Sequence, residues 1–424
     1  MRHACSRLIP QSLKNLCYHL PLAILSAVYF GFPSRRLKVI GVTGTNGKTT
    51  TTQCIASILQ KAGKKVAMAS TINFEIGEKK WTNSSKFTTL SAWKLQKFLH
   101  EAARDGCEYA IIETSSHALD QHRVWGIRYE IAVMTNVTRE HLDYHHTMKE
   151  YRRAKRRLFE RANMAVVNLD MESPEEYLHA KSFAKSVTYG IEQTKADIVV
   201  EQLSMNAEGA SFSVQGTLFQ IHLPGRYNVE NALASLAVAQ LLAIDFSIAE
   251  QALNDISGIK GRMESVLNTY GIHIFIDYAV TPDALEKLYA LITSMRSEGE
   301  CIIAVFGACG ERDRGKRPIM GSLISSFVDM LILTNEDPYH EDPERIMDEI
   351  AQGIVGKEMG KDYWRISDRR EAIARALSLA KSGDWVIVTG KGAEETMAIG
   401  NERLPWNERS VIEEELQKKN HISD

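Results

Sequence analysis

The chain has 424 residues, 44% hydrophobic and 25% charged, which is the composition of a globular protein of two or three domains. Its formal net charge is −2, so no overall basic field exists that would bind nucleic acid non-specifically. The six cysteines form no CxxC pair and are scattered through the expected strands and helices. We therefore expect reduced, buried cysteines, a cytoplasmic protein and no nucleic-acid partner.

The first 36 residues combine basic side chains with an apolar run. Arg2, Arg7 and Lys14 precede the apolar stretch 20–32, which is too short for a transmembrane helix and lacks a clear cleavage site for a signal peptide. Two interpretations stay open. The segment is either a leading helix that packs on the domain behind it or an amphipathic anchor that lies on a membrane surface.

A glycine-rich loop follows this leader. Residues 37–42 form an apolar run typical of a buried strand, glycines stand at 41, 44 and 47, and Lys48 and Thr49 open a helix. In that context backbone N–H groups and the helix N-terminus can face phosphate oxygens. Lys48 would reach the terminal phosphates and Thr49 would bind Mg²⁺. The strict spacing has glycine where Val42 stands, so the loop is a variant.

Strands and helices alternate through the rest of the first half, which predicts a mostly parallel sheet covered by helices. We expect strands at 65–69, 109–113, 131–136 and 165–169, and helices at 90–103, 149–162, 229–242 and from there to 256. Residues 198–223 alternate apolar and polar side chains, which predicts antiparallel hairpins appended to the sheet.

Near residues 258–261 a domain boundary is expected, because the strand–helix pattern starts again beyond it. The expected strands are 272–277, 301–306, 329–334 and 385–389, and the expected helices are 283–295, 343–353 and 370–380. A second, separate α/β domain follows from this alternation.

Polar residues follow two strands of the first domain. Glu113 ends one strand and precedes a run of hydroxyl side chains, and His141 lies in the loop after the next strand. The carboxyl ends of parallel strands meet at the edge where α/β sheets bind ligands. We favour a ligand role for His141, whereas His145 and His146 are more typical of a turn. The basic helix 152–161 by itself indicates a solvated face.

Several ordered motifs resemble the Mur ligases, the ATP-dependent amide-forming enzymes of peptidoglycan precursor synthesis, and most closely their MurE branch. The motifs are residues 41–50, 113–123, 135–145, 223–232, 261–264, 277–279 and 310–318. The family shares the glycine spacing of the loop, which accounts for Val42. After the apolar and basic leader (1–36), the resemblance implies a P-loop central domain with a mostly parallel sheet (37–258) and a C-terminal Rossmann-like α/β domain (259–424).

The resemblance implies ATP and Mg²⁺ as cofactors, with ATP between the two domains. Magnesium would be held by Thr49, Glu113 and His141, and Lys155 matches the lysine that the family carbamylates, whose anion would hold a second Mg²⁺. The implied catalytic residues are Lys48, Glu113, His141 and Lys155. The implied ATP contacts are Gly44, Thr45, Asn46, Gly47, Lys48, Thr49 and Thr50 for the phosphates, Asn231 near the adenine, and Arg262 and Asp277.

The implied reaction joins an amino acid to the peptide stem of a muramoyl-peptide. A substrate carboxylate attacks the γ-phosphate of ATP, and the amine of the amino acid displaces phosphate from the acyl phosphate. We expect a monomer. The residues that match muramoyl-peptide contacts are Thr88, Thr89, Ser115, Gln121 and Arg123, and those that match contacts to the added amino acid are Arg317, Asp337, Tyr339, Gly390 and Glu394.

Three departures from the family pattern affect the details. Only about 36 residues precede the first strand, too few for the family's UDP-binding domain, so a UDP-linked or a lipid-linked substrate stays open. Tyr339 stands where diaminopimelate enzymes have an arginine, and it offers no positive charge to a distal carboxylate. Val280 and Ala393 stand where the family usually has histidines.

Two alternative functions stay open. One is a related ligase on another carboxylate, of the cyanophycin or folylpolyglutamate type, and the other is a non-catalytic ATP-binding partner protein. Residues 120–123 and 143–145 favour the peptidoglycan reaction.

Overall fold

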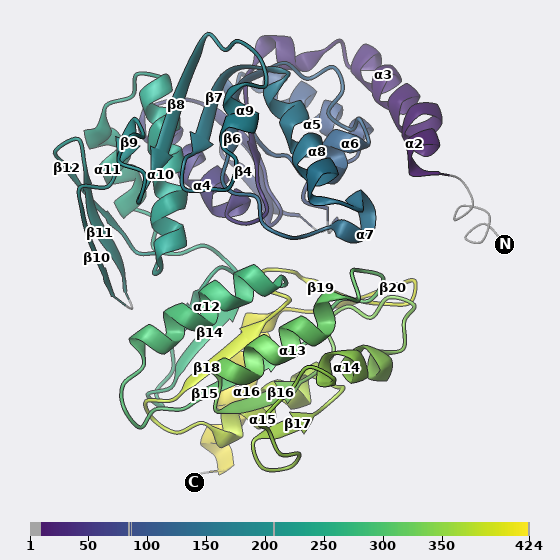
Figure 1. Ribbon diagram of the computed structural model, residues 1–424, viewed down its shortest axis with the longest axis vertical. Helices are drawn as coiled ribbons and strands as arrows, with labels where there is room; N and C mark the ends of the chain where they lie inside the picture. Colours follow the sequence, from purple (N-terminus) through teal and green to yellow (C-terminus); the bar gives the residue numbers. More distant parts are fainter. Residues whose placement is uncertain (1–9, 84, 86, 207, 423–424) are drawn as a thin grey trace. The chain divides into compact units, whose positions relative to one another are not determined.

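The computed structural model describes residues 10–83, 85, 87–206 and 208–422 (Figure 1). The chain divides into two compact units, and the main division falls between Ser257 and Gly258. Both units are α/β, as predicted. Within the described residues, no helix combines the length and the apolar character needed to cross a membrane.

A nine-stranded sheet forms the centre of the first unit, in the order β4-β3-β2-β5-β1-β6-β7-β8-β9. The central strand β1 pairs in parallel with β5 and β6, and only β3, near one edge, runs against the others, so that its pairings with β2 and β4 are antiparallel. The strands are β1 Lys38–Thr43, β2 Val66–Ala69, β3 Asn73–Ile76, β4 Lys79–Thr82, β5 Tyr109–Glu113, β6 Tyr129–Met134, β7 Ala162–Asn168, β8 Lys185–Gly190 and β9 Ile198–Val199. The predicted, mostly parallel sheet is therefore confirmed.

Helices cover both faces of this sheet. Helices α4, α10 and α11 lie on one face, and α5 and α8 lie on the other (Figure 1). The helices are α4 Lys48–Lys61, α5 Ala92–Arg104, α6 Ser116–Asp120, α7 Leu142–His145, α8 Met148–Phe159, α9 Glu175–Leu178, α10 Arg226–Leu241 and α11 Phe246–Asn254. The helix predicted to run to residue 162 ends at Phe159, because Ala162 already begins β7.

The hairpin prediction for residues 198–223 is wrong in part. Strand β9 joins the main sheet in parallel with β8, and β10 Gln202–Asn206, β11 Gly209–Val214 and β12 Thr217–Ile221 form a sheet of their own. Strands β11 and β12 are antiparallel, as expected, and their stacked Phe212 and Phe219 rings face α11, where Phe219 lies 5.9 Å from Phe246. Burial of these rings against a helix separates the hairpin from the main sheet.

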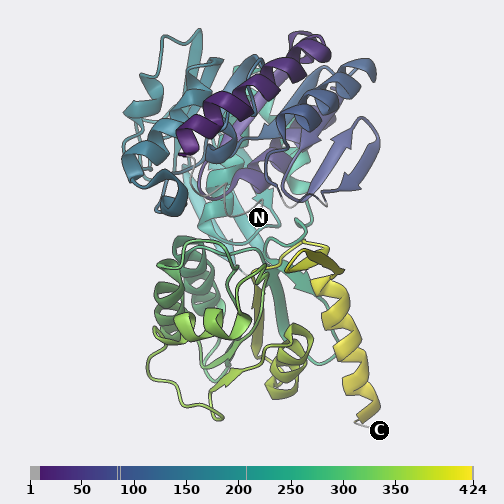
Figure 2. The same ribbon diagram turned by 90° about the vertical axis from the view of Figure 1, so that its right-hand side faces the viewer.

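The leader is helical and packs on the first unit. It consists of α2 Gln11–Lys14, a π-helical turn at Asn15–His19, α3 Leu20–Tyr29 and a 3₁₀ turn at Pro33–Arg36. Helix α3 lies along the outside of the unit and packs against α5, with Ala23, Ser26 and Ala27 facing inward (Figure 2). The packed leading helix is thereby confirmed; Cys5, Arg2 and Arg7 lie outside the described residues.

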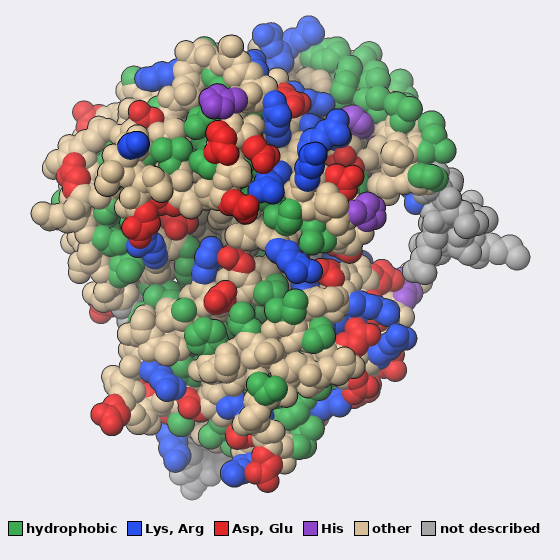
Figure 3. Space-filling model, in the orientation of Figure 1, with side chains coloured by type: hydrophobic (Ala, Val, Ile, Leu, Met, Phe, Trp, Pro, Cys, Tyr) green, Lys and Arg blue, Asp and Glu red, His purple; other side chains and the backbone are tan. Residues whose placement is uncertain are grey.

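The outer face of the leader is apolar as well. Figure 3 shows hydrophobic side chains gathered over α3, where Leu25 is 65% and Tyr29 71% exposed. Cys17 is exposed on the same segment, while Cys54 and Cys107 are buried and Cys301 and Cys309 are half-buried. These five cysteines are free, as predicted, but the prediction that all are buried is wrong, because the leader turns Cys17 outward.

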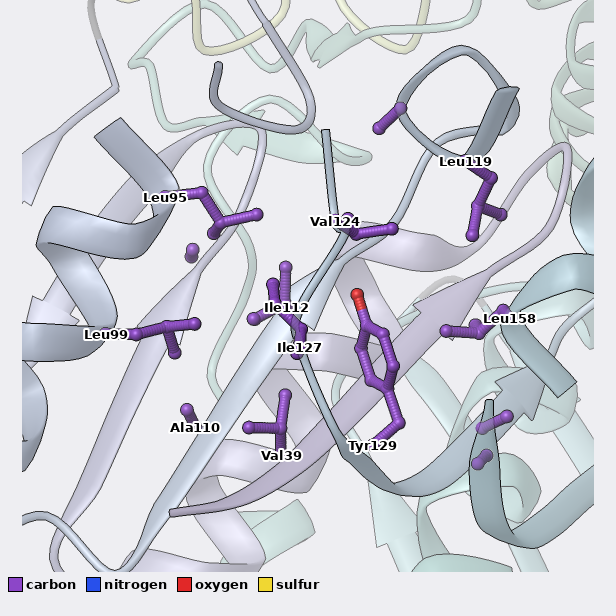
Figure 4. Close-up of a cluster of buried hydrophobic side chains, with 14 of the residues drawn as sticks. Val39, Leu95, Leu99, Ala110, Ile112, Leu119, Val124, Ile127, Tyr129 and Leu158 are labelled. Atoms are coloured by element: carbon purple, nitrogen blue, oxygen red, sulfur yellow. The ribbon is translucent and has the colours of Figure 1, made fainter. Parts of the chain in front are cut away.

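The core between α5, α8 and the sheet holds the first unit together. Val39 and Ile112 from the central strands meet Leu95 and Leu99 from α5 and Leu158 from α8 (Figure 4). All five side chains are at most 1% exposed. Burying a side chain of this size contributes about 1.5–3 kcal/mol, so this layer fixes the strands whose carboxyl ends carry the site.

The second unit is built on a six-stranded sheet in the order β13-β14-β18-β15-β16-β17, parallel except for the edge strand β13. Helices α12–α14 cover one face and α15 and α16 the other (Figure 1). The strands are β13 Glu264–Val266, β14 His273–Asp277, β15 Ile302–Phe306, β16 Met330–Leu333, β17 Tyr363–Arg365 and β18 Trp385–Thr389, with a separate hairpin of β19 Thr396–Ile399 and β20 Glu402–Pro405. The helices are α12 Pro282–Met295, α13 Lys316–Phe327, α14 Pro343–Ala351, α15 Arg369–Leu379 and α16 Glu408–Ile422.

Helix α13 has no counterpart among the predicted helices. Pro318, Gly321 and three serines lower its intrinsic helix propensity, so its sequence gives a weak helical signal. Met320 and Ile324 nevertheless bury against the sheet. The helical state of this segment therefore depends on tertiary packing more than on helix propensity.

Candidate active site

The glycine loop lies between β1 and α4, as predicted, and two of its glycines are required by close contacts. Gly47 has φ +82°, and a Cβ atom there would lie 2.2 Å from Asn231 Oδ1. A Cβ atom on Gly44 would lie 1.8 Å from Thr135 Oγ1. Only glycine lets the loop backbone approach these neighbours, so its N–H groups can be turned towards a ligand.

The loop is anchored by the residues that follow β6. Asn46 N donates to Asn136 Oδ1 at 2.9 Å, and Thr135 Oγ1 donates to Asn46 O at 2.6 Å. Thr45 N donates to Asn136 O at 2.9 Å, and Thr45 Oγ1 accepts from Thr138 N at 3.0 Å. The residues that follow β6 therefore hold the glycine loop in shape.

Replacing Gly47 with alanine is expected to weaken ATP binding at least about tenfold, because the left-handed backbone is strained by a side chain and the Cβ would clash with Asn231. Calorimetric titration with ATP measures the effect. Gly63 is the matched control: it has φ +74° at the other end of α4, with nothing within 4 Å of a Cβ. Gly63→Ala should cost about 1–2 kcal/mol of stability and leave ATP affinity unchanged; equal affinities for all three proteins would contradict the role given to Gly47.

Two lysines converge on one carbonyl group of the loop. Lys48 Nζ donates to Gly44 O at 3.0 Å and to Thr45 O at 2.7 Å, and Lys155 Nζ donates to Gly44 O at 2.7 Å. Lys155 is 1% exposed, and its burial together with the nearby Lys48 charge lowers its pKa well below the usual range. The uncharged amine needed for carbamate formation is therefore favoured at this position.

Lys155 is distinct from the other basic residues of α8. Arg152 pairs with Glu172 at 3.3 Å, Arg156 with Glu160 at 3.6 Å, and Arg157 with Asp120 at 2.8 Å. These three lie at or near the surface, as the solvated-face interpretation predicts, whereas Lys155 points inward beside the Tyr151 ring.

Glu113 is fully buried at the end of β5. Its Oε1 accepts from Thr71 N and its Oε2 from Thr71 Oγ1, both at 2.8 Å. Glu113 is thus a buried carboxyl group held by two neutral donors, and such a group retains acceptor capacity for a cation.

His141 lies at the start of α7 in the left-handed region, at φ +57°. Its ring stands edge-on to His117 with 4.7 Å between the centroids and lies 6.0 Å from Tyr151, the neighbour of Thr45. His145 is buried with Nε2 3.0 Å from Ser116 Oγ, and burial lowers its pKa to about 4. His145 is thus satisfied within the fold, while the exposed His146 lies in the turn that follows α7.

No group of three or more His, Cys, Asp or Glu side chains that could hold a metal is found among the described residues. The predicted Mg²⁺ ligands include only two residues of these types, Glu113 and His141, and add Thr49 and a carbamate on Lys155. Thr49 is buried in the first turn of α4. The Thr49 hydroxyl, the Glu113 carboxylate and a carbamate on Lys155 are hard oxygen donors that suit Mg²⁺, and His141 would add a nitrogen donor, so the three oxygen donors fit the ion.

Four of the five predicted muramoyl-peptide contacts lie together beside Glu113. Thr89 Oγ1 donates to Glu113 O at 2.8 Å and accepts from Ser115 N at 2.9 Å. Arg123 Nε donates to Gln121 Oε1 at 2.8 Å, and its Nη1 donates to Thr89 O at 3.2 Å. The fifth, Thr88, precedes Thr89 in the same loop and is half-buried.

The predicted adenine contact Asn231 lies against the phosphate loop itself. Its Oδ1 accepts from Thr51 Oγ1 at 3.2 Å, directly beside Gly47. In the second unit, the Arg262 guanidinium lies 4.6 Å from the Tyr278 ring centroid, and Asp277 accepts from Met263 N at 2.7 Å and Ala279 N at 2.8 Å. Burial raises the pKa of Asp277 in spite of the Arg262 charge.

The predicted amino-acid contacts of the second unit already have protein partners. Arg317 is fully buried and donates to Glu341 at 3.0 Å, to Glu349 at 2.6 Å and to Cys309 O at 3.0 Å. Asp337 Oδ1 accepts from Lys391 Nζ at 2.8 Å, and Lys391 Nζ also donates to Glu394 at 2.5 Å. These contacts position the side chains, and a direct substrate contact stays a prediction for each.

Two arginine side chains lie near the Tyr339 ring. Arg312 and Arg403 have their guanidinium carbons 5.8 Å and 5.2 Å from its ring centroid. The hairpin β19–β20 holds Tyr339 in place, because Tyr339 N donates to Ala398 O at 3.1 Å and Gly400 N donates to Tyr339 O at 2.6 Å. Arg312 and Arg403 therefore place positive charge near Tyr339, which is itself uncharged.

The predicted site set omits two buried side chains of the second unit. Lys391 is fully buried between Asp337 and Glu394. In the sequence, its position between Gly390 and Gly392 could have indicated a functional residue. Glu336 is 4% exposed, and its Oε2 has no hydrogen-bond partner among the described groups. A Cβ on Gly390, at φ +110°, would lie 2.8 Å from that oxygen.

A phosphate loop on a mostly parallel sheet, with a buried lysine and carboxylate beside it, defines a nucleotide-dependent enzyme of the P-loop type. Residues 42–239 match the Mur ligase middle domain, and residues 261–392 match the Mur ligase, glutamate ligase domain. The chain belongs to the Mur ligase family.

Two relatives indicate which branch of the Mur ligase family the chain resembles. The chain is 40% identical over 409 residues to the UDP-N-acetylmuramyl-tripeptide synthetase of Roseiflexus sp. (strain RS-1), an alignment that covers 91% of this chain and 80% of that protein. It is 38% identical over 406 residues to the UDP-N-acetylmuramoyl-L-alanyl-D-glutamate--2,6-diaminopimelate ligase of Clostridium botulinum (strain ATCC 19397 / Type A), covering 94% of this chain and 81% of that one.

Solved structures agree with the fold. A diaminopimelate ligase of the same description has a TM-score of 0.61 at 34% identity, covering 91% of this chain and 79% of that one. The Mycobacterium tuberculosis folylpolyglutamate synthase complexed with ADP has a TM-score of 0.71 at 18% identity, covering 88% and 91%. The latter likeness concerns the fold alone, whereas the sequence relatives favour the MurE type over the other ligases.

Proposed function

We propose that this Mur ligase uses ATP to join an amino acid to the peptide stem of a UDP-muramoyl-dipeptide precursor. The observation that carries the proposal is the buried Lys155, whose Nζ lies 2.7 Å from Gly44 O of the phosphate loop. A lysine with a lowered pKa at this place suits carbamate formation, which a loop that only binds nucleotide does not need.

Each side chain of the site has its own role in the proposed reaction. Lys48 neutralises phosphate charge, and the loop N–H groups orient the phosphates. One Mg²⁺ at Thr49, Glu113 and His141 and a second at the Lys155 carbamate would supply further positive charge at the transferred phosphoryl group. Gln121 and Arg123 orient the acceptor, and Arg123 suits a carboxylate because its guanidinium is planar and permanently charged.

The incoming amino acid would be selected in the second unit, at Arg317, Asp337, Tyr339, Gly390 and Glu394. Arg312 and Arg403 beside Tyr339 offer the positive charge that the tyrosine lacks, which keeps a substrate with a distal carboxylate compatible with the site. The contacts of Asn231, Arg262 and Asp277 with ATP, and the monomeric state, are part of the same proposal.

ADP release is expected to require both the acceptor and an amino acid. The assay combines the purified chain, ATP and Mg²⁺ with UDP-N-acetylmuramoyl-L-alanyl-D-glutamate, its lipid-linked counterpart or a folate acceptor, each with diaminopimelate, lysine or glutamate. Release that is fastest with a muramoyl acceptor supports the proposal. Release that never depends on both partners would remove the ligase function, and dependence on a folate acceptor alone would favour the other ligase type.

Lys48→Ala serves as the loss-of-function variant in this assay, with an expected decrease of at least about a hundredfold. Lys61→Ala at the opposite end of α4 is its control, because Lys61 pairs at the surface with Asp255 at 2.8 Å. Equal loss in both variants would point to general destabilisation of α4.

A further inference from the structure

The leader helices present a continuous apolar face to the outside of the first unit. A helix on a solvated surface normally turns polar side chains outward. Here six large apolar side chains are turned outward, with exposed fractions between 49% and 71%. This leader face consists of Leu13, Leu16, Tyr18, Leu25, Val28 and Tyr29.

Helix α5 extends the leader face with an aromatic group. The Trp93 ring is 41% exposed and lies 4.8 Å from Tyr29 and 4.9 Å from Phe30 between ring centroids. Tyr and Trp side chains combine an apolar body with a polar tip, which suits the boundary between lipid headgroups and acyl chains.

The charged side chains of the leader segment itself, residues 10–36, are all basic. Residues 15–34 contain no charged side chain, Lys14 stands at one end of this segment, and Arg35 and Arg36 are exposed at the other. The first acidic residue of the chain is Glu75, although the net charge of the whole chain is −2. The basic character is therefore local to the part of the chain that carries the apolar face.

We propose that the leader face lies on an anionic lipid surface. The apolar side chains would enter the boundary between headgroups and acyl chains, and Lys14, Arg35 and Arg36 would contact lipid phosphates. The helices would lie on the membrane and not cross it, because no described helix is long and apolar enough to do so.

Charge complementarity favours this partner over a second copy of the chain. Two leader faces packed against each other would bury their apolar side chains, but the segment holds no acidic residue to pair with the basic ends. In a parallel or an antiparallel arrangement cations would face cations, which is unfavourable. An anionic bilayer supplies both the apolar layer and the negative charge.

The leader is also tied to the predicted acceptor residues. Asn15 Nδ2 donates to Asp120 Oδ2 at 2.7 Å, and Asp120 in turn accepts from Tyr144 at 2.9 Å and from Arg157 at 2.8 Å. Asp120 directly precedes Gln121. A membrane-bound leader would therefore hold this part of the first unit close to the lipid surface, whatever acceptor the enzyme uses.

Cosedimentation of the full chain with vesicles tests the proposal. We expect binding to equimolar phosphatidylglycerol and phosphatidylcholine, and much weaker binding to phosphatidylcholine alone. The triple variant Leu16→Ser, Leu25→Ser, Tyr29→Ser should lower the partition coefficient at least about tenfold. Arg35→Gln and Arg36→Gln should each lower it about fivefold, and added salt should weaken binding.

The matched control variant replaces three exposed apolar side chains of the second unit with serine. Leu267, Val355 and Met359 are 90%, 61% and 58% exposed, and their triple replacement with serine should leave vesicle binding unchanged. ADP release with soluble substrates should be unaffected in every variant, so a failure of this proposal is separable from a failure of the ligase proposal.

Three results would overturn the proposal. The first is no binding of the parent chain to anionic vesicles, and the second is equal binding of the parent and the leader variants. The third is a parent chain that is dimeric and binds no vesicles, while the triple variant is monomeric. The last result would identify the leader face as a contact between copies. Because Arg35 and Arg36 are exposed, their variants retain the fold and keep the test decisive even if the triple variant folds poorly.

Discussion

Replacing Lys155 with alanine is expected to lower the ligation rate by at least about a hundredfold, the usual cost of losing a group that stabilises developing charge. Lys155 is buried with its amine 2.7 Å from Gly44 O, and its lowered pKa favours the uncharged form. That amine can attack CO₂ and lose a proton, which leaves a carbamate anion beside the phosphate loop. Rates of ADP release measure the loss.

A short carboxylic acid is expected to restore part of the activity of Lys155→Ala, because the deleted side chain leaves room for an anion near the same place. Arg156→Ala is the control on the same helix, since Arg156 pairs with Glu160 at the surface, and it should match the parent. Carbon-13 NMR with labelled bicarbonate gives an independent readout, a carbamate signal that Lys155→Ala lacks. Parent-like activity of Lys155→Ala would refute the carbamate role.

Replacing Arg369 with methionine is expected to lower the free energy of unfolding by about 3–5 kcal/mol, because Glu408 would remain buried without its partner. Both side chains are 0% exposed, and Arg369 donates to Glu408 through Nε and Nη2. Arg369 also donates to Asn335 O at 3.1 Å and Thr389 O at 2.8 Å. Chemical denaturation followed by circular dichroism measures the change.

The neighbouring Arg370 provides the control. It pairs with Glu414 at 2.7 Å and Glu415 at 2.9 Å near the surface, so Arg370→Met should cost at most about 1 kcal/mol. The double variant Arg369→Met, Glu408→Leu should regain most of the stability, since it removes the unpaired charge. If Arg369→Met costs no more than Arg370→Met, the buried pair does not stabilise the second unit.

Arg369 also links stability to the proposed amino-acid site. Asn335 and Thr389, whose carbonyls it holds, directly precede Glu336 and Gly390. We therefore expect Arg369→Met to weaken amino-acid binding as well, measured as a rise in the KM for the amino acid in the same ADP-release assay. Arg370→Met should leave that KM unchanged.

Local signals predicted most of the elements that carry the site. Strand β5 has the predicted bounds, because Tyr109–Glu113 is a short apolar run that is buried on both faces. The glycine loop was visible because its glycines meet backbone requirements that no other residue satisfies. Helix α13 was not predicted, since its helical state depends on Met320 and Ile324 packing against the sheet more than on propensity.

The sequence by itself determined the α/β class, the phosphate loop and, through its ordered motifs, the Mur ligase family, because periodicity, glycine spacing and motif order are local properties of a chain. Tertiary structure alone decided which groups meet. Lys155 reaches Gly44 O across 111 positions of sequence, Arg317 is enclosed by Glu341 and Glu349, and the leader turns apolar side chains outward as well as inward. Such contacts follow from long-range packing, in which the burial of one face fixes the partners of every polar group beneath it.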